Sequence, residues 1–115
     1  MTTYKVGDVV LVPFPFTDLA TIKQRPALVI SSSAFNRRRR DVILMAITSH
    51  LVDGNKGSDY QLTESEQKAA GLPKPSLAKL GKVVSIDQRL IRKTLGRLAP
   101  KSIQDILKKF SALLG

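Results

Sequence analysis

The chain has 115 residues, 43% of them hydrophobic, and its 19 lysines and arginines against 9 acidic residues give a formal charge of +10. This length and composition predict one domain over residues 1–115 with a compact core, and the absence of cysteine excludes disulfides and thiolate metal sites. The sequence lacks an apolar signal core and a long apolar run, so we expect a soluble cytoplasmic protein without membrane partners. The charge predicts an anionic partner, nucleic acid first and an acidic protein segment second, although a solvated surface accounts for such a charge equally well.

Two strand-like runs near the N-terminus enclose a polar segment. The first run, Asp8–Phe14, is rich in β-branched residues, and the second has its body at Ala27–Ile30. Pro26 has no N–H and restricts Arg25 to extended geometry, so the pair fits the entry of a strand, with Arg25 at its first position. We therefore expect Arg25 at a rim, beside the loop that joins the two strands.

The middle of the chain contains a charged run and then a strand. Arg37–Arg40 repel one another and predict a solvated hairpin tip. Asp41–Thr48 predicts a third strand, apolar enough to be buried on both faces. A second long loop is expected over Leu51–Ser58, followed by a short strand over Gly57–Leu62.

A capping box, Thr63 with Glu66, predicts a short helix that Gly71 ends. Residues 76–87 predict one bent strand or two, with Gly81 permitting the bend. A single turn over residues 88–91 and a last strand over residues 92–98 should follow.

The C-terminal segment predicts an amphipathic helix that packs on the sheet. Pro100 suits its first turn, whereas Ala99 is a poor N-cap. Apolar residues recur there at helical spacing, namely Ile103, Ile106, Leu107, Phe110, Leu113 and Leu114. Several short strands with few helices indicate a mainly β (α+β) fold built on a small curled sheet.

Several blocks of the sequence resemble, in order, those of the PemK/MazF family of toxins from type II toxin–antitoxin systems. The blocks are spread over nearly the whole chain and are GDVVLV (7–12), PFPFTD (13–18), RPALVIS (25–31), AITS (46–49), DYQL (59–62), AGL (70–72), KPS (74–76), ID (86–87) and LGRL (95–98).

This resemblance implies an SH3-like barrel of about five to seven strands, with a short middle helix and the C-terminal helix. It also implies a homodimer that acts as a metal-independent, sequence-selective endoribonuclease on single-stranded RNA, with no cofactor. A cognate acidic antitoxin should bind it, and operator DNA should be contacted only through the antitoxin complex. Two other interpretations stay open: a non-catalytic nucleic-acid-binding or protein-binding module, and a relative that inhibits gyrase.

RNA cleavage without a metal needs a base, an acid and a cation beside the phosphorus. The resemblance implies Arg25 as the cation, with Thr48 and Ser49 as hydrogen-bond donors. Arg25 at a strand start and Thr48 at a strand end can face each other across neighbouring strands. The alternative for Arg25 is a rim arginine paired with a carboxylate, and the alternative for Thr48 is a hydroxyl bonded locally to the backbone.

The base is less clearly marked in this sequence. Some family members carry glutamate five positions before the matching arginine, and that position is Ala20 here. Asp18 in the same loop and His50, the only histidine, are candidates, although a loop aspartate often caps a turn and a lone histidine is often just exposed. Asp87 lies where some relatives place an acidic site residue, but the arginine that precedes it by two in those relatives is Ser85 here.

The predicted RNA-contacting residues combine positive charge with one stacking candidate. Phe16 can stack a base, while Phe14 suits core packing, and the arginine run can track phosphates without sequence choice. The full set is Phe16, Thr17, Lys23, Gln24, Arg37, Arg38 and Lys56.

Overall fold

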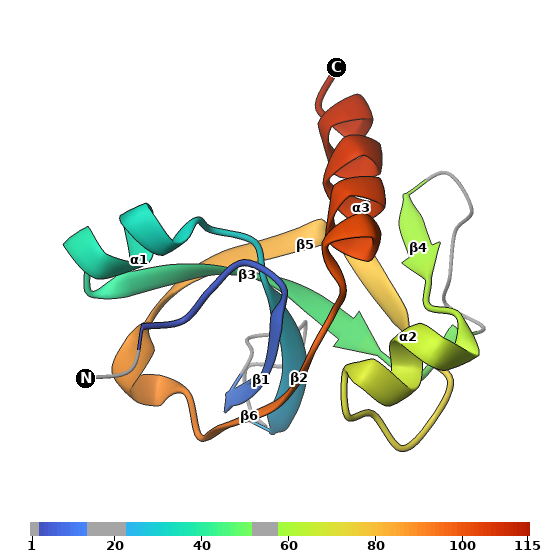
Figure 1. The fold of residues 1–115 in the computed structure, drawn as a ribbon, viewed down its shortest axis with the longest axis horizontal. Helices are drawn as coiled ribbons and strands as arrows, with labels where there is room; N and C mark the ends of the chain where they lie inside the picture. The colour runs from blue at the N-terminus through green and yellow to red at the C-terminus, as the bar shows by residue number, and fades with distance from the viewer. Residues whose placement is uncertain (1–2, 14–22, 52–57) are drawn as a thin grey trace.

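Six antiparallel strands form one sheet in the order β4-β5-β3-β2-β1-β6 (Figure 1). The structure is a computed structural model that describes residues 3–13, 23–51 and 58–115. The strands are β1 (Asp8–Pro13), β2 (Gln24–Val29), β3 (Asp41–Thr48), β4 (Asp59–Gln61), β5 (Leu77–Asp87) and β6 (Lys93–Arg97). The helices are α1 (Ser33–Arg38), α2 (Glu64–Ala69), the 3₁₀ turn η2 (Gln88–Leu90) and α3 (Pro100–Leu113).

The mainly β class with α+β character is confirmed, and the strand number lies within the predicted range. The sheet is open rather than closed into a barrel, because β4 and β6 are its two edges and do not pair with each other in the described part of the chain. None of the described helices is long and apolar enough to cross a membrane.

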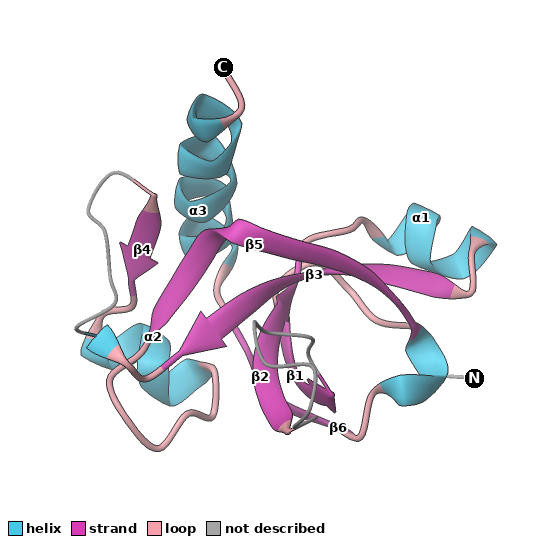
Figure 2. Cartoon of the chain, turned by 180° about the vertical axis from the view of Figure 1, so that it is seen from behind, coloured by secondary structure: helices cyan, strands magenta, loops and turns pink. Residues whose placement is uncertain are grey.

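Strand β3 is the centre of the sheet and has the bounds expected from its sequence. Its first residue, Asp41, pairs with Asp87, and its last, Thr48, pairs with Leu77. Between these ends the register shifts: Met45 pairs with Val83 and Ile47 pairs with Ala78. Two residue steps along β3 therefore lie opposite five residue steps along β5. The surplus residues make β5 one bent strand, as Figure 2 shows, with Gly81 inside the irregular segment.

Alternation of side chains along the strands divides the core between the two faces of the sheet. One cluster joins the sheet to α3 and to residues that flank α2; its buried members include Leu28, Met45, Ile47, Ala70, Leu72, Leu80, Leu98, Ile103 and Ile106. The other cluster lies on the opposite face and comprises Val10, Val12, Ala27, Val29, Val42, Leu44, Ala46 and Ile86. The neighbours Ala27 and Leu28 therefore serve different cores.

The capping box predicted for α2 is present. The Oγ1 of Thr63 accepts a bond from the Glu66 N–H (3.1 Å), and the Glu66 carboxylate accepts one from the Thr63 N–H (2.8 Å). Tyr60 of β4 also donates its hydroxyl to Glu66 (2.8 Å), and burial together with this carboxylate raises the pKa of Tyr60 to about 12. Gly71 ends the helix with φ of +72°, where a Cβ would lie 2.0 Å from the Leu95 carbonyl oxygen.

Helix α3 begins at Pro100, and its N-cap, Ala99, makes no side-chain bond, as expected. Ile103 and Ile106 are buried, but Leu113 and Leu114 at the end of the predicted stripe are 41% and 72% exposed. The last turn of α3 extends beyond the sheet in Figure 1, which explains why the stripe is covered as far as Phe110 but not at its end.

Two local predictions were wrong. Arg37–Arg40 do not form a hairpin tip, because Arg37 and Arg38 end helix α1 and the next two arginines lead into β3; all four are exposed, as predicted. Ser32 is the N-cap of α1, and its hydroxyl accepts a bond from the N–H of Phe35 (3.2 Å). Strand β2 starts at Gln24, so Arg25 is its second residue rather than its first.

Candidate functional site

Two polar side chains lie at the same end of the β2–β3 ladder. The last paired residues there are Ala27 and Ala46. Arg25 lies two positions before Ala27 on β2, and Thr48 lies two positions after Ala46 on β3. Because the strands are antiparallel and side chains alternate, Arg25 and Thr48 belong to the sheet face of the two alanines. We call this region the Arg25 end.

Arg25 is held by its neighbours on β1. It pairs with Val12, and its side chain is half-buried with a fully buried Nε atom. Burial of the stem on an apolar face limits its rotamers, while the segment that joins β1 to β2 starts directly after Pro13. This placement suits a guanidinium that must hold one orientation beside an incoming anion.

The Thr48 hydroxyl takes part in a tight turn. Its Oγ1 accepts a bond from the backbone N–H of His50 (3.1 Å), which is the local bond that was the alternative to a catalytic role. A hydroxyl that accepts one bond still has a proton to donate, so both roles are compatible. Ser49 and His50 are exposed beside it.

The other residues predicted for this end divide into two groups. Lys23 and Gln24 are exposed next to Arg25 at the start of β2. Four predicted residues lie outside the described part of the chain, namely Phe16, Thr17, Asp18 and Lys56. The roles of all these residues stay predictions. Within the described ranges, no three His, Asp or Glu side chains are grouped so that they could hold a metal ion.

Asp87 is not brought together with Arg25 and Thr48 within one chain. It pairs with Asp41, at the opposite end of β3 from Thr48, and seven residue steps of strand span about 23 Å. Its carboxylate accepts bonds from the Arg89 backbone N–H (2.9 Å), Nε (3.2 Å) and Nη2 (3.0 Å). These bonds from Arg89 lower the pKa of Asp87, with a smaller contribution from the charge of Arg40.

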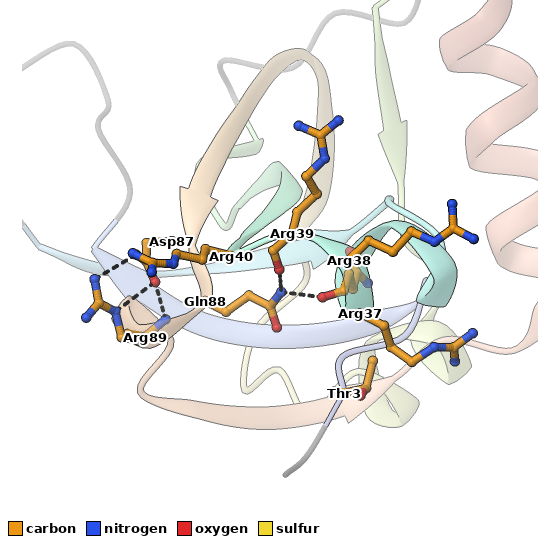
Figure 3. A pocket seen from close by; sticks show the side chains of 9 residues that line it. Thr3, Arg37, Arg38, Arg39, Arg40, Asp87, Gln88 and Arg89 are labelled. Carbon is orange, nitrogen blue, oxygen red and sulfur yellow. Dashed lines mark hydrogen bonds and ion pairs between the residues drawn. The ribbon is translucent and has the colours of Figure 1, made fainter.

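A pocket of about 800 Å³ lies at this far end of β3 (Figure 3). We call it the arginine pocket; its lining residues are Thr3, Asn36, Arg37, Arg38, Arg39, Arg40, Asp87, Gln88 and Arg89. Sequence reasoning found the arginine run but missed Gln88 and Arg89, which are distant in the chain. The pairing of Asp41 with Asp87 brings them together, and only the strand register could have revealed this.

Comparison with known proteins assigns the class. The family of PemK-like, MazF-like toxins of type II toxin–antitoxin systems matches residues 5–114. Because this match spans nearly the whole chain, the protein belongs to that family of toxins.

Solved structures of this family share the fold. MazF (form I) from Deinococcus radiodurans gives a TM-score of 0.77 at 20% identity, over 100% of this chain and 99% of that chain. An endoribonuclease from a mycobacterial species gives 0.76 at 19% identity, over 100% and 94%. A MazE–MazF complex (form II) from Deinococcus radiodurans gives 0.74 at 21% identity, over 100% and 98%. No curated protein sequence matches this chain.

Proposed function

We propose that this toxin is a metal-independent, sequence-selective endoribonuclease that cleaves single-stranded RNA at the Arg25 end. The observation that carries the proposal is the position of Arg25 and Thr48 on one sheet face at one end of the β2–β3 ladder. Family membership and the fold shared with a mycobacterial endoribonuclease support it.

The reaction starts at the 2′-hydroxyl of the nucleotide before the cut. A base removes the 2′-OH proton, the oxygen attacks phosphorus, and the 5′-oxygen leaves with a proton from an acid. The products are then a 2′,3′-cyclic phosphate and a 5′-OH. The Arg25 guanidinium stabilises the charge that develops on the phosphoryl oxygens, and the hydroxyls of Thr48 and Ser49 donate hydrogen bonds to them.

The base is proposed from two candidates. His50 is exposed directly after the Thr48–Ser49 pair, and an imidazole side chain can accept and donate protons. Asp18 belongs to the segment that joins β1 to β2, where some family members carry their glutamate. Lys23 and Gln24, exposed beside Arg25, are positioned to contact RNA that flanks the cut, together with Phe16, Thr17 and Lys56.

The proposed partners follow from charge and from the similar complexes. A MazE–MazF complex shares this fold, and a chain of charge +10 attracts an acidic antitoxin segment, which we expect to cover the Arg25 end and block RNA. The toxin acts as a single domain, and it forms a homodimer because the open sheet leaves edges to cover. It contacts operator DNA only through the antitoxin.

The proposal is tested with RNA whose cut position has first been mapped by sequencing of the fragments. Cleavage should persist in excess EDTA, leave a 2′,3′-cyclic phosphate, and stop when the cut nucleotide carries 2′-deoxyribose. Cleavage that EDTA abolishes, or that continues on the deoxy substrate, overturns the scheme.

Ala20 favours one alternative, a binding module that has lost its base. RNA that stays intact at high toxin concentration, while it still binds, supports that module. Intact RNA together with inhibition of DNA supercoiling supports instead a toxin that acts on gyrase.

A further inference from the structure

The arginine pocket concentrates positive charge at a place that the proposed cleavage reaction does not use. Five arginines line it against one carboxylate, Asp87, and Arg89 already occupies that carboxylate with bonds of 2.9–3.2 Å. Arg37, Arg38, Arg39 and Arg40 are all exposed. Such a surface binds anions, and its charge is largely uncompensated.

The backbone that carries these arginines is held by a polar network. The Gln88 side-chain amide donates to the carbonyl oxygens of Asn36 (2.7 Å) and Arg39 (3.1 Å), and its backbone N–H donates to Arg40 (2.8 Å). Asn36 is only 3% exposed and donates to the carbonyl of Tyr4 (2.7 Å). Helix α1, η2 and the N-terminal segment are thereby fixed to one another, which reduces the entropy lost when a ligand binds.

The directions of the side chains indicate the shape of the ligand. In Figure 3 the side chains of Arg37, Arg38 and Arg39 point away from one another, while Arg40 and Arg89 lie beside Asp87 on the other side of the pocket. A compact anion needs donors that converge on one point. Guanidinium groups spread in this way suit an extended polyanion that contacts them one after another.

The residues that line the pocket decide between the two extended polyanions that its positive charge allows, an acidic peptide and a nucleic acid. A disordered acidic peptide pays for its ordering and usually relies on apolar or aromatic anchors. None of the side chains that line the pocket is apolar. The affinity of nucleic acid, by contrast, comes mainly from its phosphates and needs no such anchor.

We propose that the arginine pocket binds the phosphate backbone of the RNA substrate at nucleotides remote from the cut. The inference rests on the proposed function, because it assigns the second contact of the same RNA. Phosphate contacts carry no base information, so the pocket contributes affinity and leaves sequence choice to the Arg25 end. The two regions are separated by the length of β3, about 23 Å, so only an extended substrate reaches both.

The first test measures binding without cleavage. Fluorescence anisotropy compares the RNA affinity of wild type with that of the Arg37→Gln/Arg38→Gln variant. The probe is a 2′-O-methyl oligouridylate of about 16 nucleotides, the upper site size for single-strand binders. The matched control is Lys101→Gln/Lys108→Gln, which removes the same charge from exposed residues of α3. At 0.1 M salt the pocket variant should bind roughly 5-fold more weakly per lost contact, and its salt slope should fall by about 1.4, while the control stays close to wild type.

A second arm separates this proposal from the cleavage proposal. With a cleavable RNA, the pocket variant should raise KM for an extended substrate and leave kcat/KM for a short one unchanged. If wild type cuts no RNA, the proposed function fails, and the anisotropy arm still decides whether the pocket binds phosphates.

Two outcomes overturn the inference. One is an affinity and salt slope in the pocket variant that match those of the control. The other is an unchanged RNA affinity with lost binding of a polyglutamate peptide, which would assign the pocket to an acidic protein segment.

The variant Gln88→Leu keeps the charge of the pocket but removes the side-chain hydrogen bonds that hold the backbone of the arginines. Its RNA affinity should therefore fall, while the salt slope stays nearly unchanged.

Discussion

The two ends of β3 differ in how their side chains are held. The arginine pocket is fixed by a network that joins α1, η2 and the N-terminal segment through Gln88 and Asn36. The Arg25 end consists of one half-buried guanidinium just after the connection from β1 to β2 and one hydroxyl just before the connection from β3 to β4. This difference predicts that the positive charge at one end of β3 and the proposed reactive groups at the other end can be separated by mutation.

The largest expected effect lies at the Arg25 end. Arg25→Ala should lower kcat about 10²–10³-fold, because a preorganised donor to the developing charge is lost. Arg25→Lys should recover little, since lysine lacks the planar fork that holds two phosphoryl oxygens. Cleavage of a short RNA measures both, with Arg38→Ala as the matched control that should keep its rate. An equal loss in Arg38→Ala would remove the distinction between the two ends.

The next effect identifies the base. Asp18→Asn or His50→Gln, whichever residue takes the 2′-OH proton, should lower the rate about a hundredfold. Asp41→Asn, an exposed aspartate at the far end of β3, is the control for the loss of one negative charge. Wild-type rates in both variants would exclude both residues and redirect the search to Asp87 or to the second subunit.

Asp87→Asn tests whether a change in the arginine pocket alters RNA binding without altering cleavage. Hydrogen bonds from Arg89 lower the pKa of Asp87, so the carboxylate stays charged throughout the neutral range and opposes an incoming phosphate. Its removal should release Arg89 and tighten binding of the long oligouridylate about 5-fold, while cleavage of a short RNA is unchanged. A large loss of cleavage would instead assign Asp87 a catalytic role.

Glu66 belongs to neither end and should affect stability alone. Burial raises its pKa, but hydrogen bonds from Ser102, the Thr63 N–H and Tyr60 outweigh burial, and the net pKa is lowered. A lowered pKa stabilises the fold above the unfolded value of about 4.3, and the contribution is lost as the pH falls through the folded pKa. Glu66→Gln should cost about 1 kcal/mol at pH 7 and progressively less in acid, as measured by urea unfolding. An altered cleavage rate in this variant would show that effects are not confined to the two ends.

Prediction from sequence succeeded where local signals were strong. The bounds of β3, the capping box at Thr63 and the stop at Gly71 were all read from residue types whose preferences act locally. The location of Arg25 and Thr48 followed from one assumption, that their strands are neighbours in the sheet. Their place at a shared ladder end agrees with that assumption, whereas Asp18 lies outside the described residues.

Helix α1 could not be predicted, because its stability is not local. Six residues that end in two arginines form a marginal helix in isolation. The structure holds it through the buried Asn36 side chain and through Gln88, which is 52 residues further along the chain. The same distance hid the arginine pocket, whose members meet only through the register of β3 with β5.

The bonds around Ser31 also have a consequence for the rate at which amide protons exchange with solvent. The Ser31 hydroxyl donates to Asn36 (2.5 Å) and accepts from the Ile43 N–H (3.0 Å), while Asn36 reaches the backbone of Tyr4. We therefore expect the N-terminal segment, α1 and the start of β3 to open together. Amides in this short exposed helix should exchange as slowly as those of the strand beside it, far more slowly than its length alone would allow.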